Sequence, residues 1–297
     1  MSAVPAAGSD LVARDVPMAK RTTWRVGGTA DRLVSPRSLA DLQAFLASGD
    51  AVAPFLWVGH GSNLLVRDGG LAGTVICTRS GPKALEQIDA TTVRAEAGVS
   101  SARVARFAAE AGLAGAEFLA GIPGSVGGAL AMNAGAYGSE LADILTAVEV
   151  INERGEVRRA APAEFEFAYR HARVPEGEWF VAAHLGLTPG DATTIRERTK
   201  EMLAHRERTQ PVNLANAGSV FRNPPGDHAA RLIEAAGLKG SREGGAEVSE
   251  QHANFIVNRG GARAADIEAL IRRVQERVQA FAGVSLEPEV RIVGRQA

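Results

Sequence analysis

The sequence has a single cysteine and almost no net charge, and both shortages exclude classes of protein. Because Cys77 is the only cysteine, no disulfide can form within the chain and a cysteine-based metal site is not expected. The 33 basic and 34 acidic residues nearly cancel, which argues against a nucleic-acid partner or an anionic membrane surface. Any anionic ligand must therefore be bound by local groups.

Long apolar runs and paired histidines are also missing. No apolar stretch approaches the roughly 18 residues of a membrane helix, and the start of the chain lacks a basic region followed by an apolar core. We therefore expect a cytoplasmic protein with no membrane partner. The six histidines include no HxxxH or similar pair, so we expect no metal. With 297 residues, of which 45% are hydrophobic, the chain is long enough for two or three globular domains.

The most unusual stretch is Gly115 to Gly138, which contains seven glycines together with Pro123 and Asn133. Glycine is needed where the backbone takes a positive φ or where another group comes close to the main chain. A flexible linker would be rich in Ser, Pro, Glu and Lys, whereas this stretch interleaves apolar residues such as Phe118 and Leu130. The pattern favours a buried loop whose backbone N–H groups bind phosphate. It matches neither GxxxxGK[ST] nor a GxGxxG between a strand and a helix.

A second glycine-rich turn, GHGSN at Gly59 to Asn63, directly follows the apolar run Phe55 to Val58. Alone it is weak evidence, because such turns between strands are common. Two turns of this kind are stronger evidence together, since a dinucleotide has two phosphates and two ends to hold. The sequence therefore predicts a dinucleotide site.

Strand and helix patterns alternate irregularly along the chain, which favours an α+β fold over a Rossmann fold. Ser38 and either Ser100 or Ser101 are expected to cap helices, and Gly112 to end the second of these. The other expected elements are strands at 91–99 and 179–187, a hairpin over 145–160, a charged helix over 191–211, a late helix with an apolar stripe of Ile267, Leu270, Ile271, Val274, Val278 and Phe281, and a strand over 286–293.

Three polar groups lie where packing does not require them. Ser219 is either a turn or capping serine or a hydroxyl that faces a cleft. The pair Tyr169-Arg170 offers either a surface salt bridge or a guanidinium that holds a carboxylate or phosphate. Glu289 lies in an apolar segment two residues before Arg291, so it is either paired with that arginine or kept for proton chemistry.

Seven motifs settle these alternatives by resemblance: TTWRVGGTAD, GHGSNLLV, AGIPGSVGGALAMNAGAYG, the YR pair, AGSVFRNPPGDHAARLIEAAGLKG, VSEQHANFIVN and LEPEVRIVG. In this order they resemble the UDP-N-acetylenolpyruvoylglucosamine reductase family, the UDP-N-acetylmuramate dehydrogenases. The resemblance implies FAD, NADPH as hydride donor, and reduction of a UDP-sugar enolpyruvyl ether to a lactyl ether during peptidoglycan synthesis.

Composition and resemblance together predict a domain order. The Ala-, Pro- and Gly-rich start sets apart a segment over 1–20, and the charge density of the helix over 191–210 indicates a connection near a domain boundary. The resemblance implies a two-part FAD-binding domain of the p-cresol methylhydroxylase or vanillyl-alcohol-oxidase type over 21–190 (about 21–80 and 81–190) and a C-terminal α+β substrate-binding domain over 211–297. One branch of the family closes over the substrate with a tyrosine on an extra loop. Here only Tyr137 and Tyr169 exist, both inside other motifs, so the chain resembles the branch without that loop.

Roles transfer to the matching positions by the same resemblance. Ser219 would be the proton donor, with Arg170 and Glu289 at the carboxylate end of the substrate. Substrate-binding residues would be Tyr169, Asn223 and Arg291. Non-covalent FAD would be bound by Gly59, His60, Gly61, Ser62, Asn63, Leu64, Gly121, Ile122, Pro123, Gly124, Ser125, Gly127, Gly128, Asn133 and Gly135.

The expected partners are therefore NADPH and the UDP-sugar, and we expect a monomer. An FAD oxidase of the same fold that acts on another small substrate is the alternative function. A colourless module that only binds a nucleotide sugar is a more distant one.

Overall fold

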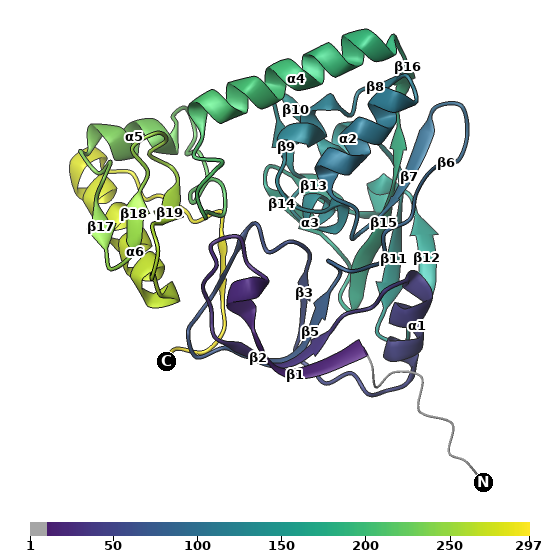
Figure 1. Ribbon diagram of the computed structural model, residues 1–297, viewed down its shortest axis with the longest axis horizontal. Helices are drawn as coiled ribbons and strands as arrows, with labels where there is room; N and C mark the ends of the chain where they lie inside the picture. The colour runs from purple at the N-terminus through teal and green to yellow at the C-terminus, as the bar shows by residue number, and fades with distance from the viewer. Residues whose placement is uncertain (1–10) are drawn as a thin grey trace. The chain divides into compact units, whose positions relative to one another are not determined.

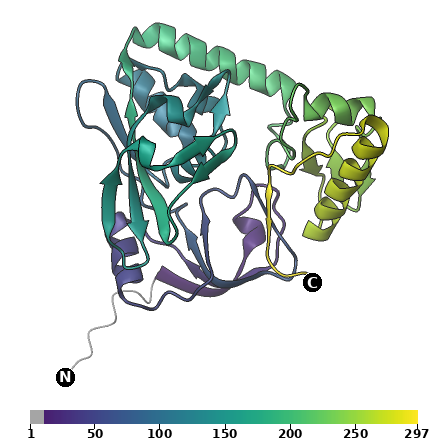
Figure 2. The same cartoon turned by 180° about the vertical axis from the view of Figure 1, so that it is seen from behind.

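The structure, a computed structural model, describes residues 11–297 and divides them into two compact units (Figures 1 and 2). Of the described residues, 11–14, 32–60 and 73–204 form the first unit, and 15–31, 61–72 and 205–297 form the second. Both units are thus built from separated segments of chain, whereas the expected domains are continuous, and their boundaries stay a prediction. Residues 1–10 of the expected N-terminal segment lie outside the described residues.

A five-stranded antiparallel sheet forms the centre of the first unit. One of its faces is apolar, and its buried residues Val93, Ala95 and Val148 belong to the same core as helices α2 (Ser101–Glu110) and α3 (Val126–Ala131). Figures 1 and 2 show both helices beside this sheet. The two strands β11 and β12 form the hairpin expected over 145–160. In spatial order the strands are β12 (Val157–Ala160), β11 (Leu145–Asn152), β15 (Glu178–Gly186), β7 (Thr92–Glu96) and β6 (Leu85–Gln87).

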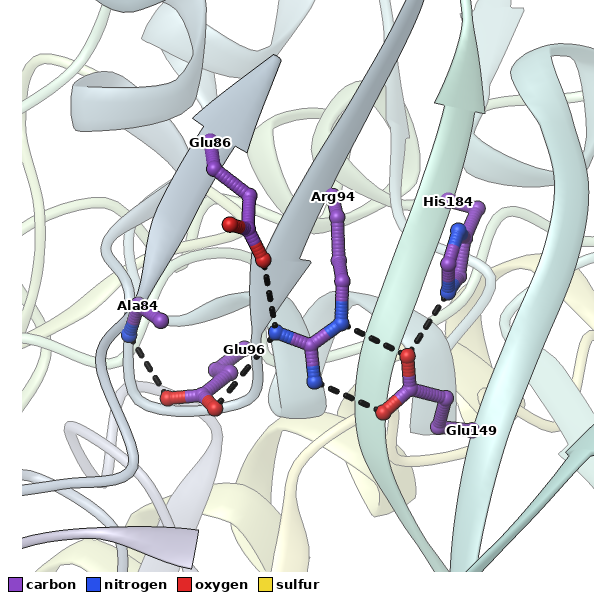
Figure 3. A network of polar contacts seen from close by, with 6 residues as sticks. All are labelled: Ala84, Glu86, Arg94, Glu96, Glu149 and His184. Atoms are coloured by element: carbon purple, nitrogen blue, oxygen red, sulfur yellow. Dashed lines mark hydrogen bonds and ion pairs between the residues drawn. The ribbon is translucent and has the colours of Figure 1, made fainter. Parts of the chain in front are cut away.

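The opposite face of this sheet holds a charged network around Arg94 and Glu149 (Figure 3). Arg94 donates to both carboxylate oxygens of Glu149, from Nε at 2.6 Å and from Nη2 at 2.7 Å. His184 Nε2 lies 2.7 Å from Glu149 Oε1, and Glu86 and Glu96 lie 3.3 and 3.6 Å from Arg94 Nη1. Hydrogen bonds from Arg94 lower the pKa of Glu149 and raise that of Arg94. The network links β6, β7, β11 and β15.

The helix caps lie where the sequence predicts them. Ser38 Oγ accepts a hydrogen bond from Asp41 N at 3.1 Å at the start of α1 (Leu39–Ala47), and Ser100 Oγ accepts one from Arg103 N at 3.3 Å at the start of α2. Gly112, expected to end α2, has a φ of +67° two residues after the helix. Each cap satisfies a backbone N–H that has no partner within its helix. These expectations are confirmed.

The first unit has a second hydrophobic core, where α1 packs against the parallel pair β3 (Phe55–Val58) and β5 (Leu71–Cys77). Leu42, Phe45 and Ile76 are buried there. Strands β1 (Val12–Pro17) and β2 (Thr29–Val34) complete a four-stranded sheet in the order β1-β2-β5-β3. Three short antiparallel pairs remain: β8 (Leu113–Ala114) with β16 (Thr188–Pro189), β9 (Gly135–Ala136) with β10 (Ser139–Glu140), and β13 (Glu166–Ala168) with β14 (His171–Arg173).

The second unit packs two helices against a small sheet. Its core includes Trp24, Phe221 and Leu270, and the indole Nε1 of Trp24 donates to the carbonyl of Ile256 at 2.7 Å. The elements are α5 (Ala229–Ala235), α6 (Ala264–Ala282), the antiparallel sheet β17 (Arg242–Glu243), β18 (Ala246–Val248) and β19 (Ile256–Asn258), and the parallel pair β4 (Leu64–Val66) and β20 (Arg291–Val293).

Two expectations about the end of the chain are wrong in detail. Phe281, expected in the apolar stripe of α6, is 61% exposed, because the helix ends one residue later and its last turn leaves the core. The expected strand 286–293 is reduced to Arg291–Val293, and before it Pro288 forms only an isolated antiparallel bridge with Phe221. The charged helix expected over 191–211 is α4 (Ala192–Thr209). Among residues 11–297 no helix is both long and apolar enough to cross a membrane.

Candidate active site

The glycine-rich loop of the first unit is bound to the segment that joins β7 to α2. Val126 N donates to Val99 O at 2.8 Å, and Gly127 N donates to Ala97 O at 2.9 Å. A Cβ at position 127 would lie 2.9 Å from the Cβ of Ala97, closer than such atoms approach. These two N–H groups, expected to face a ligand, thus bond within the protein. Gly127 is required by its close approach to Ala97.

Three buried polar atoms around this loop have no hydrogen-bond partner: Nδ1 of His60 and the hydroxyl oxygens of Ser101 and Ser125. Ser125 is 2% exposed, and a Cβ at Gly59 would lie 2.3 Å from its Oγ, so this glycine leaves the room that the serine occupies. Burial lowers the pKa of His60, helped by the charges of Arg79 and Lys83. Buried polar atoms are normally paired. Unpaired donors and acceptors beside a glycine cradle fit a large polar ligand such as FAD.

The second part of the same stretch meets the hairpin that carries Tyr169 and Arg170. Asn133, which is 1% exposed and has a φ of +39°, donates to Ala168 O at 3.3 Å and accepts from Ala142 N at 3.0 Å. Arg170 lies between β13 and β14 with a φ of +55°, and its Nη1 donates to Gly135 O at 3.1 Å. The structure therefore brings together four predicted site residues: Asn133, Gly135, Tyr169 and Arg170.

The rest of that loop is packed tightly. The missing Cβ of Gly121 would lie 2.8 Å from Cε2 of Tyr137, and Ile122 N donates to Leu119 O at 3.1 Å. Gly124 has a φ of +125° and Gly128 lies within α3. The guanidinium carbon of Arg170 lies 5.6 Å from the centre of the Tyr169 ring, a cation–π distance.

In the second unit three segments lie side by side. Asn63 donates from Nδ2 to Glu289 O at 3.1 Å, and its carbonyl accepts from Arg291 N at 3.0 Å. Glu289 N donates to Val220 O at 2.7 Å, next to Ser219. Leu64 pairs with Arg291 at the start of the parallel strands β4 and β20. Asn63, Leu64, Ser219, Glu289 and Arg291 therefore lie on adjoining strands of backbone.

The turn before Asn63 also depends on glycine. Gly61 has a φ of +66°, and a Cβ there would lie 2.1 Å from the carbonyl oxygen of Arg21. Ser62 follows it in the same turn. Asn223, expected to bind substrate, accepts a hydrogen bond on Oδ1 from Ala229 N at 3.1 Å, at the first residue of α5. Gly59 and His60 belong to the first unit and Gly61 to Leu64 to the second, so the chain crosses between the units inside this turn.

Two residues of the site are not predicted from the sequence. Ser101 is expected only as an alternative helix cap, but Ser100 is the cap and the Ser101 hydroxyl is buried without a partner. Asn254 has no predicted role within VSEQHANFIVN, yet it is 4% exposed and bonds to the backbone beside Ser219. A polar residue between apolar ones, as in HANFIV, was the available signal.

Comparisons with known proteins agree with this geometry. Residues 210–293 match the family described as UDP-N-acetylenolpyruvoylglucosamine reductase, C-terminal domain, and residues 30–161 match the FAD binding domain family. Proteins named UDP-N-acetylenolpyruvoylglucosamine reductase are similar to the chain in Alkalilimnicola ehrlichii (58% identity over 94% of this chain and 93% of the relative) and Methylococcus capsulatus (55%, over 99% and 96%).

A solved structure is similar too. The crystal structure of UDP-N-acetylenolpyruvylglucosamine reductase from Thermus caldophilus has a TM-score of 0.81 and 38% identity, and the match covers 95% of this chain and 98% of that one. The predicted α+β fold, with an FAD-binding domain and a C-terminal domain, is confirmed, as is FAD as cofactor. The chain belongs to the UDP-N-acetylenolpyruvoylglucosamine reductase family.

Proposed function

We propose that this chain reduces UDP-N-acetylglucosamine enolpyruvate to UDP-N-acetylmuramate with NADPH, in the cytoplasm, as a step of peptidoglycan precursor synthesis. The observation that carries the proposal is the 2.7 Å hydrogen bond from Glu289 N to Val220 O, which holds two residues with predicted catalytic roles, Ser219 and Glu289, on adjoining segments. The relatives named above support the same reaction rather than that of an FAD oxidase.

The residues proposed to hold FAD are those of the two glycine turns, Gly59 to Leu64 and Gly121 to Gly128, with Asn133 and Gly135. FAD, when bound, supplies hydride transfer, from NADPH to the terminal carbon of the enolpyruvyl double bond. The unpaired atoms of His60, Ser101 and Ser125 are the donors and acceptors that such a ligand would satisfy.

FAD is proposed to be non-covalent. His60 is the single histidine in the two turns, and its Nδ1 is buried. Acid precipitation of the purified yellow protein should therefore release the flavin into the supernatant. Colour that stays with the pellet would show a covalent bond, with His60 the first residue to examine by peptide mass.

Residues of the chain itself would stabilise the negative charge that develops on the substrate and donate the proton. Hydride addition builds negative charge on the carbon next to the substrate carboxylate, and the guanidinium of Arg170 would stabilise it as an oxyanion hole does. The hydroxyl of Ser219 would donate its proton to that carbon as the general acid. Glu289 would orient the carboxylate end, either protonated or through a partner, and Tyr169, Asn223 and Arg291 would bind the substrate.

The test is to separate the two halves of the reaction. Anaerobic NADPH should bleach the flavin absorbance, and the enolpyruvyl sugar should then restore it while gaining two hydrogens by mass. Bleaching without restoration by this sugar, together with rapid oxygen consumption, would support the oxidase alternative instead. A colourless protein would support a binding module.

The remaining partner predictions are proposals too. We propose that the protein is a monomer and that it binds no nucleic acid. We also propose that no tyrosine from an extra loop closes over the substrate diphosphate. Light scattering after size exclusion should give a mass near 31.0 kDa. A dimer mass that persists on dilution would contradict the proposal.

A further inference from the structure

The two residues that follow Ser219 have every backbone polar atom bonded, and three of the five bonds come from one residue, Asn254. Val220 N donates to the carbonyl of Asn254 at 2.8 Å. Phe221 N donates to Oδ1 of the same residue at 2.9 Å, and Phe221 O accepts from its Nδ2 at 2.8 Å. The carbonyl of Val220 accepts the other two, from Glu289 N at 2.7 Å and from Val290 N at 3.4 Å.

These bonds are shielded from water. Val220, Phe221 and Asn254 are 0%, 2% and 4% exposed. A primary amide that pairs with both the N–H and the C=O of one residue imitates a neighbouring strand, and it holds that residue's peptide groups in one orientation. An ionised carboxylate cannot make the same pair, because it has no donor for Phe221 O, and a hydroxyl has one polar atom where the pair needs two.

Asn254 is itself held in place. It lies between β18 and β19, where Ser249 N donates to Phe255 O at 2.8 Å and Phe255 N donates to His252 O at 3.0 Å. Its own N–H donates to Nδ1 of His252 at 3.3 Å. On the other side of Ser219, Gly218 N donates to Oδ1 of Asn216 at 2.9 Å. Ser219 is therefore flanked on both sides by backbone fixed through asparagine amides.

We propose that Asn254 is the positioning residue for the Ser219 hydroxyl in the proton-transfer step. The inference rests on the proposed role of Ser219 as proton donor. A general acid acts over hydrogen-bond distances, and a displacement of about 1 Å can lower a rate by about 10²-fold. The amide of Asn254 prevents such a displacement by fixing the peptide groups next to Ser219. It contacts no reacting atom itself.

The test compares Asn254→Asp with Asn258→Ala. Asn254→Asp keeps the acceptor for Phe221 N but places a carboxylate oxygen against Phe221 O, so the segment must shift. Asn258 is the matched control: it lies on β19, donates to Trp24 O at 2.9 Å and accepts from Gly260 N at 2.8 Å, and its side chain bonds to neither Val220 nor Phe221. If the Asn254→Asp variant does not bind FAD, Asn254→Ser takes its place in the comparison.

The readout is the rate of each half-reaction by anaerobic stopped flow. We expect flavin reduction by NADPH within about two-fold of wild type in every variant. Reoxidation by the enolpyruvyl sugar should slow by about 10- to 100-fold in Asn254→Asp, with a larger solvent deuterium isotope effect, and should be unchanged in Asn258→Ala. Equal thermal destabilisation of both variants with unchanged reoxidation would overturn the inference.

A double-mutant cycle separates this inference from the function on which it rests. If Asn254 acts through the serine hydroxyl, Asn254→Asp should add nothing to the slowing already caused by Ser219→Ala. Independent, multiplying effects would overturn the positioning role while leaving Ser219 as the donor. A Ser219→Ala variant with normal reoxidation would overturn the donor role, and the positioning role with it.

Discussion

The two units differ in how complete their sites are without a ligand. In the first unit the hydroxyls of Ser101 and Ser125 and Nδ1 of His60 are buried without partners beside a glycine loop. In the second unit every backbone polar atom of Val220 and Phe221 is bonded within the protein. Because unpaired buried polar atoms cost stability, the first unit gains by binding a cofactor. In the second unit the backbone next to the proposed proton donor, Ser219, is already fixed by these bonds.

Substitutions in the glycine loop should therefore abolish cofactor binding altogether. In Gly127→Val the added side chain meets Ala97, whose Cβ would be 2.9 Å away, so the loop must leave β7 and the beginning of α2. We expect colourless protein with no activity in either half-reaction. The measurement is flavin absorbance per chain after purification.

Gly138→Asn is the matched control for that loop. Its φ of +80° suits asparagine, and nothing lies within 4 Å of the added Cβ, so it should purify yellow. A folded, fully loaded Gly127→Val protein would contradict the view that this loop must stay against Ala97 to bind FAD.

A substitution of Ser219, the proposed proton donor in the second unit, should leave FAD bound and slow only one of the two half-reactions. Reduction by NADPH needs no proton from Ser219, so it should survive Ser219→Ala, whereas reoxidation by the enolpyruvyl sugar should slow by about 10²- to 10⁴-fold. Ser219→Cys should restore part of the rate. Stopped-flow absorbance with each substrate added in turn measures both steps, and equal slowing of both would mean that Ser219 only shapes the turn.

The distance along the chain between interacting residues decides which features could be predicted from the sequence. Local signals sufficed for Ser38 and Ser100 as caps and for the hairpin over 145–160, because a cap or a hairpin depends on neighbours a few residues away. The glycine turns were visible because positive φ and close contact leave few other choices.

Contacts between distant segments gave no such signal. Asn254 bonds to Phe221 across 33 residues, and Arg94 meets Glu149 across 55. Neither pair can be found before the strand order is known. The bounds of the last strand also depend on a distant partner, because Arg291–Val293 pairs with Leu64–Val66, whereas periodicity alone predicts a strand over 286–293.

The hydrogen bonds of the charged network in the first unit should contribute more to the free energy of unfolding than neutral hydrogen bonds do. Glu149 is a shared acceptor for Arg94 and His184, and its side chain is 13% exposed. Glu149→Gln should lower the free energy of unfolding by about 2–3 kcal/mol, because Arg94 would lose its bidentate charged partner.

Glu166→Gln is the control for that loss. Its pair with Arg173 spans 3.7 Å, both side chains are more than 60% exposed, and the expected change is within about 0.5 kcal/mol. Urea unfolding of both variants measures the difference. Equal losses would contradict a special role for the network on the sheet.

The smallest expected effect is on the pH dependence of stability, where a buried carboxylate and a buried histidine act in separate pH windows. The pKa of Glu149 is lowered by hydrogen bonds from Arg94, so its contribution is complete above the unfolded value of about 4.3 and is lost as pH falls below it. The pKa of His252 in the second unit is lowered by burial, so stability falls earlier, as pH drops below about 6.5 and the unfolded chain takes up the proton.

Urea midpoints between pH 7.5 and 3.5 separate the two windows. His252→Asn, which keeps an acceptor near Asn254 N, should flatten the curve between about pH 6.5 and 5. A slope that remains there belongs to His60, whose pKa burial also lowers. Glu149→Gln should flatten the curve only below about pH 4.3, where Glu149 takes up a proton in the unfolded chain but stays ionised in the folded network. If the glutamate variant changes the upper window and the histidine variant the lower one, the assignment of the lower window to Glu149 and of the upper one to His252 is wrong.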